Sequence, residues 1–434
     1  MKRLVLALSF GLALLISVSA RADHLEVRRD ATLKQAPIRH AATLIRPEIG
    51  SKLQVLDGGR QTQGYYRAYD PKSDQTGWIY RTLVRRYPGD LAAWQARSAG
   101  PLLDPSAYSS ASLIAHFVDV GQGDAAILEF PCGLVMIDAG AGSKADAAHL
   151  TGYLARIFDR RADLEDRIAA LFVTHTHIDH NRALRDVAGR FRIERYIHNG
   201  VYDGSGRHAA RWMRDEIENG APIEQQIVTQ TMIAGLETRE GFTSEVVDPL
   251  SCDGVDPEIR VLSGPYEDNP GWPSGAFENG NNRGISIRVE FGRAALLFTG
   301  DMEEHALDTF VEFYEGAPLL DVDLYQVGHH ASHNATTEAL MQAMTPDIAV
   351  MSHGGIENRD CIFCAWAYGH PREDTVALLD LWIERRRRAP VEGLVASGAR
   401  TFHSLRMEDA ILSTAWDGDI VVVATADGGF MMNQ

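Results

Sequence analysis

The sequence predicts an α/β protein with mixed sheets, preceded by a small all-β domain. Two patterns lead to this prediction. From Leu113 onward, short apolar runs typical of strands alternate with longer stretches of helical periodicity. Residues 25–88 instead contain only short runs with period-two alternation, separated by Gly, Pro and Asp. The length of 434 residues favours two or three domains, and the 45% hydrophobic content is enough for a large core.

The N-terminus has the pattern of a secretory signal peptide. Lys2 and Arg3 form a charged start, residues 4–19 are apolar, and Ala20-Arg21-Ala22 has the small residues of a cleavage site. The alternative is an uncleaved anchor, but the apolar run is shorter than the ~20 residues that a spanning helix needs. We therefore expect cleavage after Ala22 (signal peptide 1–22), export to the periplasm or the medium, and no transmembrane segment in the mature chain.

Residues 24–90 are predicted to form a small barrel, because short strands follow one another with turn residues between them. The succession VRRDATLKQAP, GSKLQVLD, YYRAYD and TGWIYRTLV resembles a bacterial SH3 domain. Such domains tether exported enzymes to cell-wall polymers, so the resemblance implies a cell-wall contact; the alternative is a spacer. The net charge of this region, 12 − 7 = +5, suits an anionic partner. Residues 91–112, rich in Pro, Gly, Ser and Ala, are predicted to be a linker.

The remaining chain is strongly acidic. Residues 91–434 carry 27 − 51 = −24 charges, which disfavours simple electrostatic binding of nucleic acid. A nucleic-acid substrate is not excluded, because bound metal ions invert the local field. The basic run Arg385–Arg388 is interpreted as a solvated face at the end of a helix.

The segment LFVTHTHIDHN, residues 171–181, predicts a metal site. His175 and His177 follow a buried strand and can close on one metal, while Asp179 and His180 can point at a second. Imidazole and carboxylate ligands suit zinc, and also manganese or iron. Two such metals activate one hydroxide and clamp both oxygens of a displacement. We therefore predict two divalent metals, with zinc first.

The HxHxDH motif is that of the metallo-β-lactamase superfamily. HFVDVGQGDAAILEF with LVMIDAG, NNRGISIRVEFGRAALLFTGDME, VGHHAS, YGHP and ILSTAWDGDIVVVATADG resemble, in order, the hydrolase domain of the competence protein ComEC. The resemblance implies an αββα sandwich over residues 113–434. Similar motifs occur in cell-wall phosphorylcholine esterases of the superfamily, and the membrane channel of ComEC has no counterpart here, so DNA uptake is not implied.

The resemblance also assigns residues. It implies that Asp301 bridges the two metals and that His330 binds the second metal while His329 faces the substrate. His370 resembles the late histidine of the family and is expected at the rim. The residues expected behind the ligands are Asp138, Asp124 and Asn282, with Gln122 in the same turn as Asp124.

Two departures from the family pattern stand out. No histidine occurs between the HxHxDH motif and Asp301 at the place of the usual third ligand, where the sequence reads VLSGPYED and ENGNNRGIS. The metal at His175 and His177 is therefore expected to be poorly ligated, and so either weakly bound or absent. RDCIFCAWA is inserted before Tyr368 and is expected to form a stapled lip over the site.

The four cysteines are Cys132, Cys252, Cys361 and Cys364. An even number in an exported protein allows disulfides. The single CxxC spacing at 361–364 favours a local disulfide or free thiols over a structural zinc. The sequence leaves the pairing open.

We therefore predict an exported phosphodiesterase, acting through a metal-bound hydroxide on nucleic acid or an envelope polymer. The metal ligands are expected to be His175, His177, Asp179, His180, Asp301 and His330, and the catalytic residues Asp179, His329 and His370. One alternative is amide or ester hydrolysis, as in lactamases and lactonases. Another is a non-catalytic cell-wall-binding protein acting through the SH3-like module.

Overall fold

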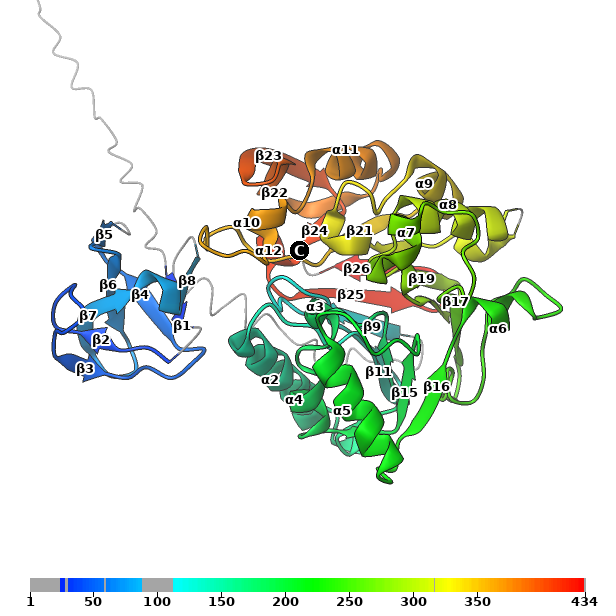
Figure 1. The fold of residues 1–434 in the computed structure, drawn as a ribbon, viewed down its shortest axis with the longest axis horizontal. Coiled ribbons are helices and arrows are strands. Elements are labelled where there is room, and N and C mark those ends of the chain that lie inside the picture. Colours follow the sequence, from blue (N-terminus) through cyan, green and yellow to red (C-terminus); the bar gives the residue numbers. More distant parts are fainter. Residues whose placement is uncertain (1–23, 28–29, 58–59, 88–111, 316, 433–434) are drawn as a thin grey trace, which may run out of the picture.

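The computed structural model describes residues 24–27, 30–57, 60–87, 112–315 and 317–432 (Figure 1). The predicted signal peptide, 1–22, lies outside these residues. So does the predicted linker, 91–112, except for Ser112, which begins a strand. Within the described ranges, no helix has both the length and the apolar character needed to cross a bilayer.

The described residues of the N-terminal module form mainly strands, together with the short 3-10 helix η2 (Arg81–Leu83). Its sheet has the order β3-β2-β7-β6-β4-β1-β8, with β5 paired to β6. Side chains including Leu25, Leu33, Leu53 and Ile79 fill its core. The predicted all-β character is confirmed, whereas the SH3 resemblance stays a prediction. The strands are β1 (His24–Val27), β2 (Leu33–Lys34), β3 (Thr43–Ile45), β4 (Lys52–Val55), β5 (Gln61–Thr62), β6 (Tyr65–Asp70), β7 (Gln75–Tyr80) and β8 (Val84–Tyr87).

The larger domain contains a first sheet in the order β16-β15-β13-β11-β10-β9-β25-β26. Its strands from β11 to β16 run parallel, and the others are antiparallel, so the sheet is mixed as predicted. These strands are β9 (Ser112–Phe117), β10 (Ala126–Phe130), β11 (Gly133–Ile137), β13 (Ala170–Val173), β15 (Arg195–His198), β16 (Glu224–Ile227), β25 (Ile420–Thr425) and β26 (Phe430–Met432).

A second sheet, in the order β17-β18-β19-β20-β21-β24, packs face to face against the first. Phe117 of β9 stacks on Phe298 of β19 in the apolar layer between them. These strands are β17 (Pro257–Ser263), β18 (Ser286–Phe291), β19 (Ala294–Phe298), β20 (Leu324–Gln326), β21 (Ile348–Met351) and β24 (Ile411–Ser413).

Helices cover the outer faces of both sheets (Figure 1). Leu150 and Leu154 of α2 pack with Ile127 and Met136 on the outer face of the first sheet, and α8, α9 and α11 cover the second. The predicted αββα sandwich is confirmed. The helices are α2 (Lys144–Arg160), α3 (Ile178–Asn181), α4 (Leu184–Ala188), α5 (Arg207–Glu218), α6 (Gln230–Ala234), α7 (Ser274–Glu278), α8 (Glu304–Phe313), α9 (Glu338–Met344), α10 (Ala365–Tyr368), α11 (Glu373–Trp382) and α12 (Thr414–Asp417).

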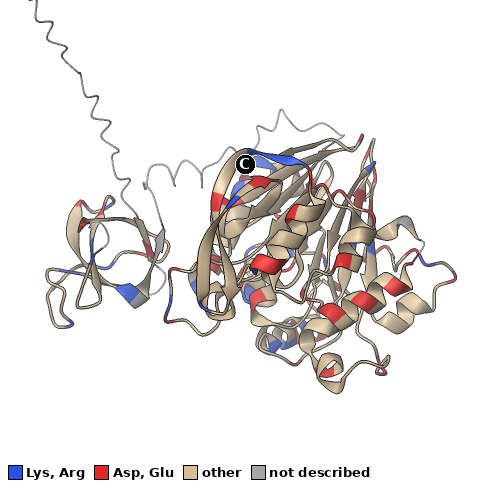
Figure 2. Ribbon diagram, turned by 90° about the horizontal axis from the view of Figure 1, so that it is seen from above, with Lys and Arg blue, Asp and Glu red and all other residues tan. Residues whose placement is uncertain are grey.

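Asp and Glu recur along the helices of the larger domain, as its acidic composition predicts (Figure 2).

The larger domain also contains elements besides the two large sheets and the α-helices given above. The remaining elements are η4 (Ala162–Leu164), β12 (Arg167–Ile168), β14 (Arg192–Ile193), η5 (Gly280–Arg283), η6 (Pro318–Leu320), η7 (Gly328–Ala331), β22 (Arg386–Gly398) and β23 (Thr401–Asp409).

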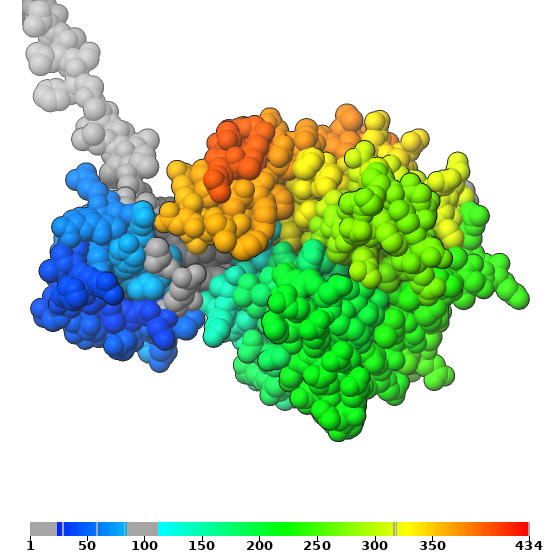
Figure 3. Space-filling model, viewed as in Figure 1, coloured from blue at the N-terminus to red at the C-terminus, as the bar shows by residue number. Residues whose placement is uncertain are grey.

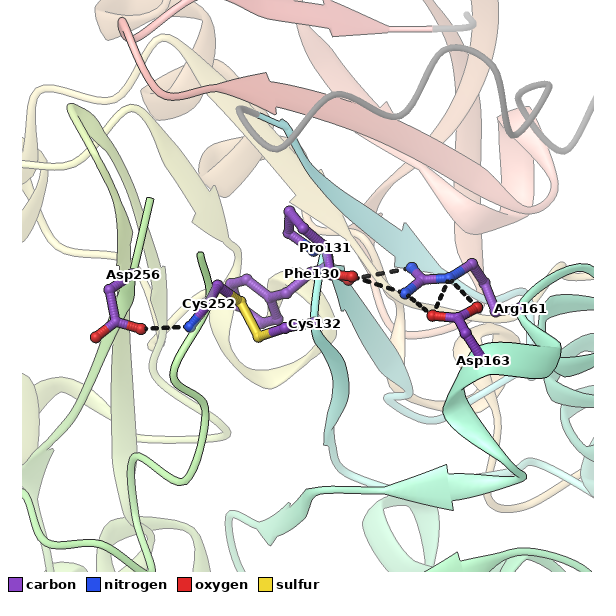
Figure 4. Close-up of a disulfide and its surroundings, with 7 residues drawn as sticks. All are labelled: Phe130, Pro131, Cys132, Arg161, Asp163, Cys252 and Asp256. Carbon is purple, nitrogen blue, oxygen red and sulfur yellow. Dashed lines mark hydrogen bonds and ion pairs between the residues drawn. A yellow bond between two sulfur atoms is a disulfide. The ribbon is translucent and has the colours of Figure 1, made fainter. Parts of the chain in front are cut away.

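All four cysteines form disulfides, and no cysteine is free. Cys132, at the turn between β10 and β11, pairs with Cys252 (Figure 4). Cys361 pairs with Cys364. Next to the first bridge, Arg161 donates to the carbonyl oxygens of Phe130 and Pro131. The turn is therefore tied both to the loop before β17 and to the end of α2.

The basic run Arg385–Arg388 differs from its predicted form. Helix α11 ends at Trp382, and β22 begins at Arg386. Arg387 is buried and donates to the carbonyl oxygens of Ala389 and Ile411 and to the Asp417 carboxylate. The predicted solvated helix end is therefore wrong for Arg387, because an ion pair and two backbone carbonyls satisfy its guanidinium inside the protein.

Candidate metal centre

The predicted ligands come from the loops that follow β13, β19 and β20. Strands β19, β20 and β21 are parallel neighbours, so their carboxyl ends meet at one edge of the second sheet. The described residues contain two groups whose ligand atoms lie within 4.8 Å of one another, and Asp301 belongs to both. One group is Asp124, His180, Asp301 and His330, and the other is His175, His177 and Asp301.

In the first of these groups, a carboxylate fixes the orientation of His180. Its Nδ1 lies 2.7 Å from Asp138 Oδ2, so Nδ1 carries the proton that this bond needs. Asp138 also accepts from the backbone N–H and the hydroxyl of Thr174, at 2.7 and 2.8 Å. The other ring nitrogen, Nε2, lies 3.1 Å from Asp301 Oδ1. This is the role predicted for Asp138.

His330 is oriented in the same way by a backbone group. Its Nδ1 donates to the carbonyl oxygen of Ser352 at 2.8 Å. Its Nε2 then faces Asp179 Oδ2 at 3.4 Å and Asp301 Oδ2 at 3.8 Å. The backbone φ of His330 is +54°, in the left-handed region that side chains seldom adopt. This strained backbone conformation directs the imidazole towards the carboxylates.

The buried polar atoms of this group that have no hydrogen-bond partner fit a cation. His180 Nε2, His330 Nε2 and Asp301 Oδ1 are buried and have no hydrogen-bond partner. Buried polar atoms are seldom left unpaired, because each costs about 1–3 kcal/mol. Two imidazole lone pairs and a carboxylate oxygen at one point are the donors that a divalent metal takes. Asp124 joins them, since its Oδ2 lies 3.7 Å from His180 Nε2 and its Oδ1 accepts from Gln326.

The other group is smaller. His175 Nε2 lies 3.0 Å from His177 Nδ1 and 3.6 Å from Asp301 Oδ2. No third histidine lies in this group, in agreement with the departure seen in the sequence. The donor set of two imidazoles and a shared carboxylate fits a second cation with an incomplete protein shell.

The loop in the place of a third histidine is η5. A Cβ at Gly280 would lie 2.9 Å from His177 Nε2, so this loop lies against the smaller group. Asn281 donates from Nδ2 to Glu303 Oε1 at 2.8 Å, and its buried Oδ1 has no partner. Asn282 lies behind the site as predicted, because its Oδ1 accepts from the backbone N–H of Glu303.

The electrostatics of the centre couple its acids and bases. Burial lowers the pKa of His180, but the charges of Asp301 and Asp138 outweigh burial and hold this pKa well above its usual value. Burial also lowers the pKa of His330, but the charges of Asp301 and Asp124 outweigh burial and raise this pKa to about 10. Burial raises the pKa of Asp301, and the neighbouring imidazoles reverse the shift to well below the usual value. The centre therefore keeps ionised carboxylates in a buried place.

His329 and His370 lie beside His330. The side chain of His329 is 21% exposed, and its Nε2 accepts from Asn281 Nδ2 at 3.3 Å. His370 is buried, with Nδ1 3.3 Å from Gln122 Nε2 and its ring stacked on that of His330. Burial holds the pKa of His370 well below its usual value. Both residues therefore lie next to the candidate ligands, although His370 is buried and not at the rim where it was expected.

The histidines of the centre were predicted from the sequence, but the residues that hold them in place were not. Asp124 was predicted to lie behind the ligands. The structure instead groups it with the donor atoms of His180, Asp301 and His330. Gln326, Thr174 and Glu303 hold site residues and were not singled out, although each adjoins a motif. His353 lies outside both groups, where its Nε2 contacts Ser413 Oγ at 2.7 Å.

Comparison with known proteins gives a family match. The family model described as the metallo-beta-lactamase superfamily matches residues 118–355, more than half of the chain. This stretch begins before Asp124 and includes all of the predicted metal ligands. It ends before the insert and His370.

Among curated proteins, ComE operon protein 3 of Bacillus subtilis is 28% identical over 300 residues, which is 64% of this chain and 32% of that protein. Recombination protein 2 of Haemophilus influenzae is 35% identical over 74 residues, 17% of this chain and 9% of that protein. The chain therefore spans a third or less of these relatives. Among solved structures, the metallo-beta-lactamase fold protein YhfI from Bacillus subtilis is 11% identical, with a TM-score of 0.35, covering 68% of this chain and 100% of that one.

Proposed function

The chain belongs to the metallo-beta-lactamase superfamily, a family of hydrolases, and we propose that it is a metal-dependent phosphodiesterase. The observation that supports this most strongly is the pair of ligand groups that share Asp301. Two cations held by one bridging carboxylate suit the displacement at a phosphodiester, in which the attacking and leaving oxygens both carry charge.

In the proposed enzyme, His175, His177 and Asp301 hold one cation. His180, His330 and Asp301 hold the other, with Asp179 and Asp124 beside them. When bound, two divalent cations lower the pKa of water and neutralise the phosphoryl charge. We propose zinc, with manganese or iron as alternatives, because these metals accept mixed imidazole and carboxylate ligands.

The protein residues supply orientation and proton transfer. Asp138 and the Ser352 carbonyl each hold one ring nitrogen of a ligand, so the opposite nitrogen stays aimed at the centre. Asp179 faces His330 from the more exposed side of the centre and stays ionised, because its close approach to His330 and the charge of His180 outweigh burial and lower its pKa. His329 and His370 lie next to His330. We propose that one of them gives the leaving oxygen a proton or steadies the phosphoryl charge.

Two features support the substrate and compartment that we propose. The names of the relatives, a recombination protein and a protein of the ComE operon, favour nucleic acid over an envelope polymer as the substrate, although they align over only a third or less of their length. The two disulfides favour an oxidising compartment, and so support export.

The test is hydrolysis by the full chain after loading with Zn²⁺ or Mn²⁺. The substrates are bis(p-nitrophenyl) phosphate, plasmid DNA and nitrocefin, with Asp179→Ala as the variant. We expect turnover of the two phosphodiesters, little of nitrocefin, and a loss of about 100-fold or more in the variant. No turnover of either phosphodiester by the loaded protein would refute the proposal, and cleavage of nitrocefin alone would replace it with amide hydrolysis.

A further inference from the structure

We propose that the insert forms an aromatic subsite that stacks a nucleobase of single-stranded nucleic acid beside the metal centre. The subsite, called the lip below, consists of residues 358–368. The proposal rests on the phosphodiesterase function and adds the substrate class. The family match ends at residue 355, so the insert, residues 359–367, lies outside it, and Tyr368, which begins the YGHP motif, borders the insert.

The lip exposes apolar surface that a folded protein normally buries. Ile362 is 67% exposed and Phe363 is 73% exposed, and Tyr368 at the end of α10 is 43% exposed. The Cys361–Cys364 disulfide closes the loop that carries the first two. Clustered apolar side chains on a closed surface loop are typical of binding surfaces. Figure 3 shows this part of the surface, in orange, standing out beside the N-terminal module.

A ladder of rings connects the lip to the metal centre. His330 stacks on His370 with ring centroids 6.1 Å apart, and His370 stacks on Tyr368 at 5.6 Å. Phe363 follows, 6.4 Å from Tyr368. Exposure rises along this path from 1% at His330 and 6% at His370 to the two open rings. A flat group stacked on Tyr368 would therefore lie at the exposed end of a path of rings that leads to His330.

The electrostatics of Tyr368 agree with the position that its ring contact with His370 gives it. Burial raises the pKa of Tyr368, and the Asp179 carboxylate raises it further. Tyr368 is nevertheless 43% exposed. Gln122 contacts Nδ1 of His370, and this contact helps to orient the ring that lies between the metal centre and Tyr368.

Arginines beside the lip indicate an anionic ligand. The Arg359 guanidinium lies 4.8 Å from the Trp366 ring centroid, and the backbone N–H of Arg400 donates to the Trp366 carbonyl. Both arginines are exposed, and neither forms an ion pair with a carboxylate of the described residues. Exposed aromatic rings with nearby arginines are the elements that bind single strands, through base stacking and phosphate contacts.

The positive charge beside the rings also distinguishes between two ligands that bind aromatic rings. One is a nucleobase, and the other is the quaternary ammonium group of an envelope phosphodiester. A quaternary ammonium is recognised by several ring faces without a competing cation. Here the Arg359 guanidinium lies against the Trp366 ring, and it repels such a group. The lip also meets the N-terminal module, where Asp360 pairs with Arg81 at 3.3 Å. In Figure 1 the loop before α10 extends towards that module.

The experiment compares a single-stranded oligonucleotide with one of equal length whose bases have been removed. Binding is measured by fluorescence anisotropy in the presence of chelator, and cleavage after metal loading. For wild type we expect at least 10-fold tighter binding and a 10-fold lower KM for the oligonucleotide with bases, within the range of one stacked base. Tyr368→Ala should remove most of this difference and Tyr368→Trp should retain it.

A matched control is Leu381→Ala, because Leu381 is 75% exposed at the far end of α11. Its binding and KM should equal those of wild type. Equal affinity of wild type for the two oligonucleotides would overturn the proposal, as would an unchanged base preference in Tyr368→Ala. Competition by phosphorylcholine rather than by a nucleotide would also overturn it. If bases strengthen binding but neither oligonucleotide is cleaved, the phosphodiesterase function fails and the lip proposal stands.

Discussion

Replacing Asp138 by Asn should weaken metal binding without changing any ligand. The Asp138 carboxylate accepts three hydrogen bonds, from the backbone and hydroxyl of Thr174 and from His180 Nδ1. An asparagine has one acceptor oxygen and one NH₂ group in the same space, so at least one donor then faces another donor. His180 loses both its fixed orientation and the charge behind it.

The expected loss follows from this contact. Removing a carboxylate behind a metal-bound histidine costs about 10- to 100-fold in affinity, which is ~1.4–2.7 kcal/mol. The assay is competition for Zn²⁺ with a chromophoric chelator, together with circular dichroism to check folding. Asp248→Asn is the control, since Asp248 accepts a bond from Ile259 N–H far from the ligands. A folded Asp138→Asn protein with affinity within twofold of wild type would refute the reasoning, as would an equal loss in the control.

Three further predictions concern the fold. The Cys132–Cys252 bridge closes a segment with a sequence separation of 120, so replacing both residues by Ala should destabilise the protein by up to ~4–5 kcal/mol, and reductant should abolish the difference in urea midpoint from wild type. Arg387→Ala leaves Asp417 buried without its cation, so we expect a loss of about 3–5 kcal/mol in thermal or urea unfolding, partly recovered by adding Asp417→Asn; a loss below 1 kcal/mol would contradict the buried pair. Burial lowers the pKa of His198 to about 4, so as the pH falls from ~6.5 to ~4 the unfolded chain takes up this proton first and about 2–3 kcal/mol of stability is lost. His198→Gln should flatten that part of the pH profile, and an unchanged profile would show that other groups cause it.

The sequence predicted the parts of the centre that are local in the chain. The HxHxDH segment places its histidines on one loop, and the strand before Asp301 ends in a recognisable turn. Both kinds of signal need only the alternation of apolar residues and the residue that follows it. The αββα order was predictable for the same reason, with the family resemblance choosing among the possible sheet arrangements.

The supports of the centre were not predictable in this way. Gln326 contacts Asp124, and Asn281 contacts Glu303 and His329, across separations that only the folded chain closes. Arg387 looked like a surface cation because its partner, Asp417, lies 30 residues later. The disulfide pairing stayed open because four cysteines allow three connectivities, and only the meeting of the turn at Cys132 with the loop at Cys252 selects one.

Counting bound metal tests the central claim most directly. Equilibrium dialysis of the full chain against Zn²⁺ or Mn²⁺, followed by elemental analysis, gives the number of cations per chain. The shared carboxylate predicts two for wild type, with the cation at His175 and His177 the weaker of the two. It predicts loss of both in a folded Asp301→Ala variant and loss of only the weaker one in His177→Ala. No bound metal in wild type, or two cations retained without Asp301, would contradict the account.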